Sequence, residues 1–278
     1  MRKIKIVADT SCDLLSLSYA SYAYAPMKVT TAERDFVDNA DLNVEEMVEY
    51  LYNYKGASRS SCPNTNDWLD AFGDGDDIFC VTITGGLSGS YNSACSAKNV
   101  YESENEGKRV FVIDSLSAGP ECTMIVEKLE DCIRQGLSYE DICQKIGEYT
   151  KHTALTFMLK SLKNFANNGR ISPLVAKLVG MAGICIVGRA STEGTLEPLH
   201  KCRGEKRSLE AIVEEMASRG FVKGKVSIGH CMNPEGAQAL KELLLSKHPE
   251  ASITIHKLHG LCSFYAEKGG ILVGYEME

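Results

Sequence analysis

Residues 77–94 have the sequence DIFCVTITGGLSGSYNSA, which is the clearest indication of the fold class in this chain. The first part, IFCVTIT, is rich in β-branched and aromatic residues and has turn-forming flanks, so it predicts a strand. A glycine- and serine-rich loop follows at residues 85–90, and a helix is predicted from Tyr91 towards Val100. A strand, a glycine-rich loop and a helix in this order are typical of an α/β protein.

The rest of the first half repeats this alternation of strands and helices. Strands are predicted at residues 3–8 and 109–113. Helices are predicted at residues 44–54, near 66–72, at 120–135 and after Ser138, with Asn43 as the N-cap of the first. Alternating strands and helices imply right-handed crossovers, so we expect a mainly parallel sheet with helices on both faces.

The second half has a more mixed order. Helices are predicted at residues 156–165, 173–179, 206–219 and 234–247. Strands are predicted at residues 183–188, 195–200, 225–230, 252–258 and 270–275, the first two as a hairpin. We therefore expect a smaller α+β layer with a partly antiparallel sheet. The predicted division is an N-terminal lobe, residues 1–155, and a C-terminal lobe, residues 156–278, which pack closely around a ligand.

Composition excludes several classes of protein. The chain has 278 residues, of which 44% are hydrophobic and 24% charged, so a disordered or fibrous protein is excluded. The net charge of −7 argues against nucleic-acid binding, which needs clustered basic residues. No signal peptide or membrane-spanning segment is expected. The 11 cysteines are scattered without a C-x-x-C pair, which favours reduced thiols and a cytoplasmic location.

Polar residues follow three of the predicted parallel strands. Ligands of such sheets bind beyond the carboxyl ends of the strands, so these residues are expected to line a cleft. They are Asp9, Thr10, Ser11, Thr84, Ser88, Ser90, Asp114 and Ser115.

The loop at residues 84–90 predicts an anion site. Its glycines leave backbone N–H groups free at the start of a helix, where the helix dipole favours a phosphate or a carboxylate. It lacks the patterns of a Walker loop and of G-x-G-x-x-G, so a nucleotide cofactor is not expected. Ser60, Ser61 and Cys62 add further polar groups before a proline, and Arg170 could pair with a carboxylate. The six histidines show no metal-binding spacing, and neither a metal nor another cofactor is predicted.

Five short segments, in this order, resemble the DegV family of bacterial fatty-acid-binding proteins. They are Asp9-Thr10-Ser11, Ser60-Ser61-Cys62-Pro63, Leu87-Ser88-Gly89-Ser90-Tyr91, Val112-Ile113-Asp114-Ser115 and Gly169-Arg170-Ile171. The resemblance covers nearly the whole chain.

The resemblance implies a function as well as a fold. A long-chain fatty acid would lie in a tunnel between two lobes, with its carboxylate near Ser61, Ser88, Gly89 and Arg170. The protein would be a carrier without catalytic residues. It would present the acid to a separate ATP-dependent kinase subunit, whose acyl phosphate product passes to phospholipid synthesis. Transient contact with a membrane is compatible with that role.

This sequence departs from the family pattern at the expected head group. The family commonly has a histidine near the C-terminus that helps hold the carboxylate, and counting back from the last strand places Tyr265 there. His259 lies six residues earlier and would reach the site only if the loop folds back. Ser60 and Cys62 also replace a threonine and a glutamine of the family.

Two alternatives to a carrier remain open at this point. The first is a stand-alone enzyme that acts on a small carboxylate or phosphorylated substrate, which predicts a compact polar pocket. The second is a regulatory module, whose activity would not depend on Ser88 or Arg170.

Overall fold

The structure is a computed structural model that describes residues 2–172, 175 and 183–277. The elements of the first half are, in order, β1 (Ile4–Asp9), η1 (Thr10–Cys12), β2 (Ser21–Ala25), β3 (Lys28–Thr30), β4 (Asp35–Val37), α1 (Val44–Asn53), β5 (Arg59–Ser61), α2 (Thr65–Phe72), β6 (Asp77–Thr82), α3 (Ser90–Glu104), β7 (Arg109–Asp114), α4 (Pro120–Arg134), α5 (Tyr139–Tyr149) and η2 (Thr150–His152).

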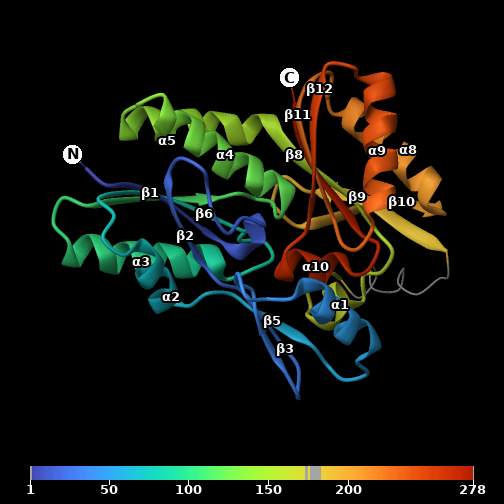
Figure 1. The fold of residues 1–278 in the computed structure, drawn as a ribbon, viewed down its shortest axis with the longest axis horizontal. Coiled ribbons are helices and arrows are strands. Elements are labelled where there is room, and N and C mark those ends of the chain that lie inside the picture. The colour runs from blue at the N-terminus through green and yellow to red at the C-terminus, as the bar shows by residue number, and fades with distance from the viewer. Residues whose placement is uncertain (1, 173–174, 176–182, 278) are drawn as a thin grey trace.

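A four-stranded parallel sheet in the order β2-β1-β6-β7 organises the first half, as the sequence predicted. Its central strand β6 is buried along its whole length because each face of the sheet is covered by helices. Apolar residues of α4 and α5 pack on one face, and those of α2 and α3 pack on the other. Figure 1 shows these layers, with α4 and α5 above the sheet and α2 and α3 below it.

The second half is built around a six-stranded mixed sheet. Its elements are, in order, β8 (Thr153–Leu159), α6 (Lys163–Asn167), β9 (Ile184–Ala190), β10 (Leu196–Arg203), α8 (Glu205–Ser218), β11 (Gly224–His230), α9 (Pro234–Lys247), β12 (Ala251–Lys257), α10 (Gly260–Ala266) and β13 (Ile271–Glu276). The strand order is β10-β9-β8-β13-β11-β12, and β11 and β12 are its parallel pair. The predicted hairpin is confirmed as the antiparallel pair β9 and β10.

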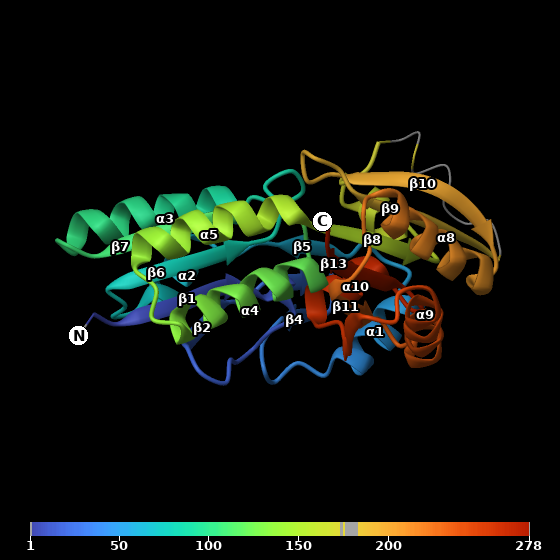
Figure 2. The same ribbon diagram turned by 90° about the horizontal axis from the view of Figure 1, so that it is seen from above.

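The two faces of this sheet differ in what covers them. Helices α8 and α9 lie together on the outer face, as Figure 2 shows. The inner face packs against α10, α1 and the small antiparallel sheet β4-β3-β5, which come from opposite ends of the chain. The division into residues 1–155 and 156–278 stays a prediction, and its boundary falls inside β8.

One predicted element is wrong. Residues 156–165 were expected to be a helix, but the start of this stretch, up to Leu159, belongs to β8, and α6 begins only at Lys163. Every residue of β8 is buried, since the two faces of the sheet are both covered. A strand of this kind gives a continuous apolar run, which hydrophobic periodicity does not separate from a helix. The predicted helix at residues 173–179 lies outside the described residues, apart from Val175.

Helix α4 holds the two main sheets together. It packs against β1 and β6 of the parallel sheet and against β8, β11 and β13 of the mixed sheet. Gly274 of β13 permits this approach, because a Cβ there would lie 2.6 Å from the backbone nitrogen of Glu121. The loops that follow β6 and β7 are thereby brought against the inner face of the mixed sheet.

Candidate functional site

A cavity of about 310 Å³ lies between the loops of the parallel sheet and the inner face of the mixed sheet. This volume falls within the range of small-molecule binding pockets. The walls come from β5, from the loops after β6 and β7, from β8 and β13, from the hairpin β9–β10 and from α10. No single element encloses the cavity, and its lining residues are spread from Met27 to Leu272.

Most of the wall is apolar. Leu155, Phe157 and Leu159 of β8 face the cavity from one side of the strand, because side chains two residues apart share a face. The other apolar residues of the lining are Met27, Ile83, Leu87, Ala118, Phe165, Ala190, Leu196, Leu261, Ala266 and Leu272. Such a wall suits a hydrocarbon chain rather than a small polar molecule.

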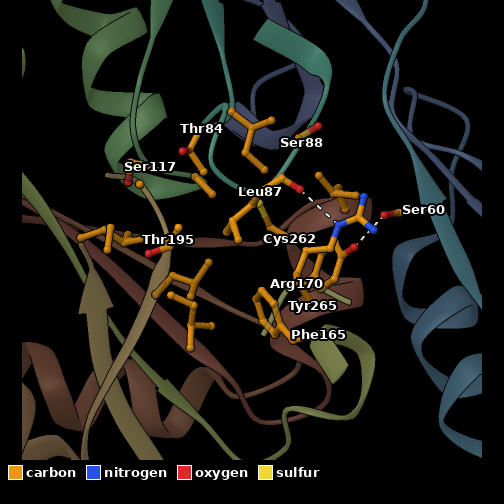
Figure 3. A pocket seen from close by; sticks show the side chains of 18 of the residues that line it. Ser60, Thr84, Leu87, Ser88, Ser117, Phe165, Arg170, Thr195, Cys262 and Tyr265 are labelled. Atoms are coloured by element: carbon orange, nitrogen blue, oxygen red, sulfur yellow. Dashed lines mark hydrogen bonds between the residues drawn. The ribbon is translucent and has the colours of Figure 1, made fainter. Parts of the chain in front are cut away.

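Polar groups gather at one end of the cavity. The Oγ of Ser60 and the hydroxyl of Tyr265 share a hydrogen bond of 2.7 Å, and the ring of Tyr265 packs on Phe165 with 4.6 Å between centroids. Figure 3 shows Ser60, Tyr265 and Arg170 together here, with Ser117 and Thr195 at the opposite side. Burial raises the pKa of Tyr265, so its hydroxyl keeps its proton at neutral pH and can donate to an anion.

Arg170 supplies positive charge at this end. Its Nε donates to the carbonyl oxygen of Leu87 at 3.1 Å, and its Nη1 donates to the carbonyl oxygen of Asn168. Arg189 also lines the cavity, but it is neutralised by ion pairs with Glu197 and Glu215 at 2.8 and 3.0 Å. Among the described residues, no carboxylate lies within ion-pairing distance of Arg170.

The glycine-rich loop of the sequence analysis also lines the cavity, and Figure 3 shows Thr84 on the side of Ser117. Thr84, Ser88 and Gly89 all face the cavity. The Oγ of Ser88 accepts a hydrogen bond from the backbone of Ser90 at 3.2 Å, while Gly89 begins the 15-residue α3 without a side-chain cap. The first N–H groups of a helix have no partner within it, so the start of α3 adds to the positive potential here.

The predicted site residues fall into two groups. Ser60, Ser61, Cys62, Thr84, Ser88, Gly89, Arg170 and Tyr265 line the cavity. Asp9, Thr10, Ser11, Ser90, Asp114, Ser115 and His259 are described but are not part of its lining. The second group was expected at the cleft because its members follow strands or lie near the predicted head group.

Asp9 is at the centre of a closed polar cluster beneath the loops. It is fully buried and accepts hydrogen bonds from the backbone of Ile83 at 2.9 Å and from the hydroxyl of Ser90 at 2.6 Å. The backbone and hydroxyl of Ser11 also donate to it. The Oγ1 of Thr10 accepts from the backbone of Met27 at 3.0 Å. These groups hold the loops after β1 and β6 in place.

Asp114 and Ser115 have a similar role after β7. Asp114 accepts hydrogen bonds from the backbone nitrogens of Gly85 and Leu116, each at 3.1 Å. Ser115 donates to the carbonyl oxygen of Ser117 at 3.0 Å and accepts from its backbone nitrogen at 3.1 Å. These hydrogen bonds shape the loop that follows β7.

His259 lies in a separate cluster at the start of α10. Its Nδ1 bonds to Asp38, which also accepts from the backbone of Gly260 and Leu261, and its backbone nitrogen donates to Asp13 at 2.7 Å. Burial lowers the pKa of His259, but its hydrogen bond to Asp38 and the charges of Asp38 and Asp13 raise it by more. Burial raises the pKa of Asp13 to about 8. This cluster anchors α10, and His259 is not among the residues that line the cavity.

Several residues at the cavity were not singled out from the sequence. Phe165 lines the cavity, and Asn168 lies behind it in contact with Arg170. Both precede Arg170 closely in the chain, and this nearness was the signal that could have found them. Ser117 and Thr195 come from a loop and a hairpin turn that meet only in the folded chain. No pattern in the sequence joins them.

Two kinds of feature are absent from the part of the chain that the structure describes. Within residues 2–172, 175 and 183–277, no group of three or more His, Cys, Asp or Glu side chains is arranged to hold a metal ion. In that same part of the chain, no helix has both the length and the apolar character needed to cross a membrane.

Comparisons with known proteins give one consistent result. A family model described as "Uncharacterised protein, DegV family" matches residues 3–278. A DegV domain-containing protein of Streptococcus pneumoniae strain R6 is 43% identical over 278 residues, which covers 99% of each chain.

Solved structures agree with that match. The Fatty Acid Kinase (Fak) B3 protein of Streptococcus pneumoniae, loaded with linoleic acid, has a TM-score of 0.97 and 42% identity, and the match covers 99% of this chain and 100% of that one. A DegV family protein from Eubacterium eligens, loaded with heptadecanoic acid, has a TM-score of 0.96 and 39% identity with the same coverage. The matches extend over the whole fold, and the chain belongs to the DegV family.

Proposed function

We propose that this protein binds one long-chain fatty acid in the cavity and presents it to a separate ATP-dependent kinase that forms an acyl phosphate. The observation that carries the proposal is an arginine without a carboxylate partner, among the described residues, at one end of a largely apolar cavity. A fatty acid complements this cavity, because it has a negative carboxylate at one end of a hydrocarbon chain. Two related structures, at 42% and 39% identity, hold fatty acids.

The carboxylate is proposed to lie among Arg170, Ser61, Ser88 and Gly89, with the Tyr265 hydroxyl as a further donor. Charge-assisted hydrogen bonds to an arginine are stronger than neutral ones. Tyr265 would then take the place of the family histidine, and its high pKa keeps it a donor at any pH near neutral.

The acyl chain is proposed to lie along β8, β13 and α10. Each buried CH₂ contributes about 0.8 kcal/mol, so a long chain supplies most of the affinity. The carboxylate group then sets the direction in which the acid enters.

A kinase partner needs access to the head group. Ser61 and Gly89 line the cavity and are exposed. The name of the Fak B3 relative supports a kinase system, and the absence of a nucleotide-binding loop from the sequence supports a separate ATP-binding subunit. We further propose a cytoplasmic location and a single functional unit made of both lobes.

The first test is lipid extraction and mass spectrometry of the purified protein, followed by titration with C16–C18 acids. We expect a bound long-chain fatty acid, and for Arg170→Ala we expect a 10- to 100-fold weaker affinity, roughly the loss of a charged hydrogen bond. Arg203→Ala is the matched control, because Arg203 is exposed at the end of β10, away from the cavity.

Two outcomes would contradict the proposal. Recovery of ligand-free protein that does not bind added acids would exclude fatty-acid binding. Turnover of a small carboxylate or phosphorylated substrate without a partner would favour the stand-alone enzyme. The kinase step is tested separately, by the formation of acyl phosphate when a bacterial ATP-dependent fatty acid kinase subunit is added with ATP.

A further inference from the structure

The side chain of Asn168 binds the outer edge of β5. Its Oδ1 accepts a hydrogen bond from the backbone nitrogen of Ser60 at 3.2 Å, and its Nδ2 donates to the carbonyl oxygen of Ser58 at 3.2 Å. The N–H of Ser60 and the carbonyl oxygen of Ser58 come from residues two apart in the chain. A neighbouring strand would form hydrogen bonds with the same pair of groups. The amide of Asn168 thus takes the place of a peptide group beside this three-residue strand.

The same residue also holds Arg170. The carbonyl oxygen of Asn168 accepts from Nη1 of Arg170, and Nδ2 of Asn168 also donates to the carbonyl oxygen of Asn164 in α6 at 2.9 Å. Gly169 between them has a φ of +69°, which reverses the chain after α6. Asn168 is therefore fixed to α6 and contacts both sides of the polar end of the cavity.

These two sides come from distant parts of the chain. Ser60 and Ser61 belong to β5, which is paired on its other side with β3, whereas Arg170 follows α6. Ser60 also shares the hydrogen bond with Tyr265. Without the Asn168 amide, the nitrogen of Ser60 and the carbonyl of the buried Ser58 would each lose a partner.

We propose that Asn168 is a positioning residue for the fatty-acid carboxylate, an inference that rests on the proposed function. It sets the distance between the hydroxyl groups of β5 and the guanidinium of Arg170. A carboxylate bound between these groups needs both at hydrogen-bonding distance, and small displacements weaken such bonds steeply. Asn168 is not among the residues that line the cavity, so its effect on the acyl chain is expected to be small.

The experiment compares a fatty acid with the alcohol of equal length, which has the same chain without the charge. Hexadecanoic acid and hexadecan-1-ol are titrated against the full-length protein by displacement of a fluorescent fatty acid. The readout is the ratio of the two dissociation constants, which reports on the head group alone. A residue with only a structural role would change both constants together and leave the ratio unaltered.

Three variants are measured alongside the wild type. Asn168→Ala removes the amide, and we expect the preference for the acid to fall by about 5- to 30-fold, the loss of one to two neutral hydrogen bonds. Asn168→Asp keeps the acceptor for Ser60 but loses the donor and adds a negative charge beside Arg170, so a larger fall is expected. Asn167→Asp is the control, since Asn167 is exposed and precedes Asn168 directly.

The outcomes separate this inference from the proposed function. If wild type binds neither compound, the proposed function fails and the inference fails with it. If wild type prefers the acid and Asn168→Ala and Asn168→Asp keep that preference, only the inference is overturned. Circular dichroism establishes that each variant is folded, and the isosteric Asn168→Asp provides the decisive measurement if Asn168→Ala does not fold.

Discussion

Two hydroxyl-rich regions of this molecule use similar residues for different purposes. The cluster around Asp9 is sealed beneath the loops, and each oxygen of its carboxylate accepts hydrogen bonds from protein donors. The cluster around Ser60, Tyr265 and Arg170 faces the cavity, and its guanidinium has no carboxylate partner among the described residues. The first cluster shapes loops, whereas the second has hydrogen-bonding capacity left for a ligand.

Polar residues at the ends of strands can therefore have either a structural role or a binding role. Structural and ligand-binding polar residues both occur at the ends of parallel strands, because turns and binding sites favour the same side chains. The distinguishing property is whether the protein itself satisfies the polar atoms. A buried carboxylate whose hydrogen-bond donors all come from the protein has a structural role. Its removal should lower the free energy of unfolding and leave ligand affinity largely unchanged.

The largest effect is expected from Asp9→Ala. This change leaves the buried nitrogen of Ile83 and the hydroxyl of Ser90 without their acceptor. Each buried donor left unsatisfied costs about 1–3 kcal/mol, so we expect a loss of about 2–6 kcal/mol. Urea denaturation measures the loss. Asp70→Ala is the control, because Asp70 is an exposed aspartate in α2.

A different outcome would undo the comparison. If Asp9→Ala weakens fatty-acid binding strongly while its free energy of unfolding stays within 1 kcal/mol of wild type, on the order of a surface substitution, the sealed cluster belongs to the site after all.

The anchor of α10 should make stability depend on pH. The pKa of Asp13 is raised to about 8, so the folded state keeps a proton that the unfolded chain releases near pH 4, and stability falls as pH rises between these values. The pKa of His259 is also raised, so its contribution is present below about 6.5 and is lost as pH rises through its folded pKa. Both effects have the same sign.

We expect the free energy of unfolding to decrease by up to about 4 kcal/mol between pH 5 and pH 8.5 on account of this anchor, since each pH unit below the folded pKa of Asp13 changes it by about 1.4 kcal/mol. Urea titrations at several pH values measure the change. Asp13→Asn should flatten the dependence, whereas His200→Gln, at an exposed histidine of β10, should leave it as in wild type. A pH dependence that is identical in Asp13→Asn and wild type would show that Asp13 is ionised in the folded protein.

The smallest effect on stability is expected at the cavity. Ser60→Ala removes a half-buried hydroxyl whose partner, Tyr265, can turn to a ligand or to water. Stability should change by less than about 1 kcal/mol, while affinity for a fatty acid should fall about 3- to 10-fold. Thermal denaturation and acid titration measure the two quantities. Tyr265→Phe is the matched partner, and equal losses of affinity in the single and double variants would show that the pair acts as a unit.

The sequence predicted the parallel sheet and the cavity-lining loop well because both depend on local patterns. Strand β6, the glycine-rich loop and α3 are contiguous, and their order alone indicates which loop lines the cavity. Arg170 was found through its short motif, and Tyr265 through its distance from the last strand.

Other features depend on contacts between distant segments. The strand β8 was mistaken for a helix because both of its faces are covered. The burial of Asp9 results from donors at residues 83 and 90, and the anchoring of His259 results from Asp38, more than 200 residues away in the chain. Local sequence patterns do not indicate hydrogen-bond partners that lie so far away in the chain.

The hairpin β9–β10 meets the glycine-rich loop at a place with no room for side chains. A Cβ on Gly86 would lie 2.6 Å from the carbonyl oxygen of Glu193, and a Cβ on Gly194 would overlap the Oγ1 of Thr84. In evolutionary terms the two positions are coupled, since a relative that gains a side chain at either one must withdraw its hairpin from the loop. Such a relative would have a wider opening at this wall of the cavity, and the residues at 86 and 194 should therefore vary together across the family.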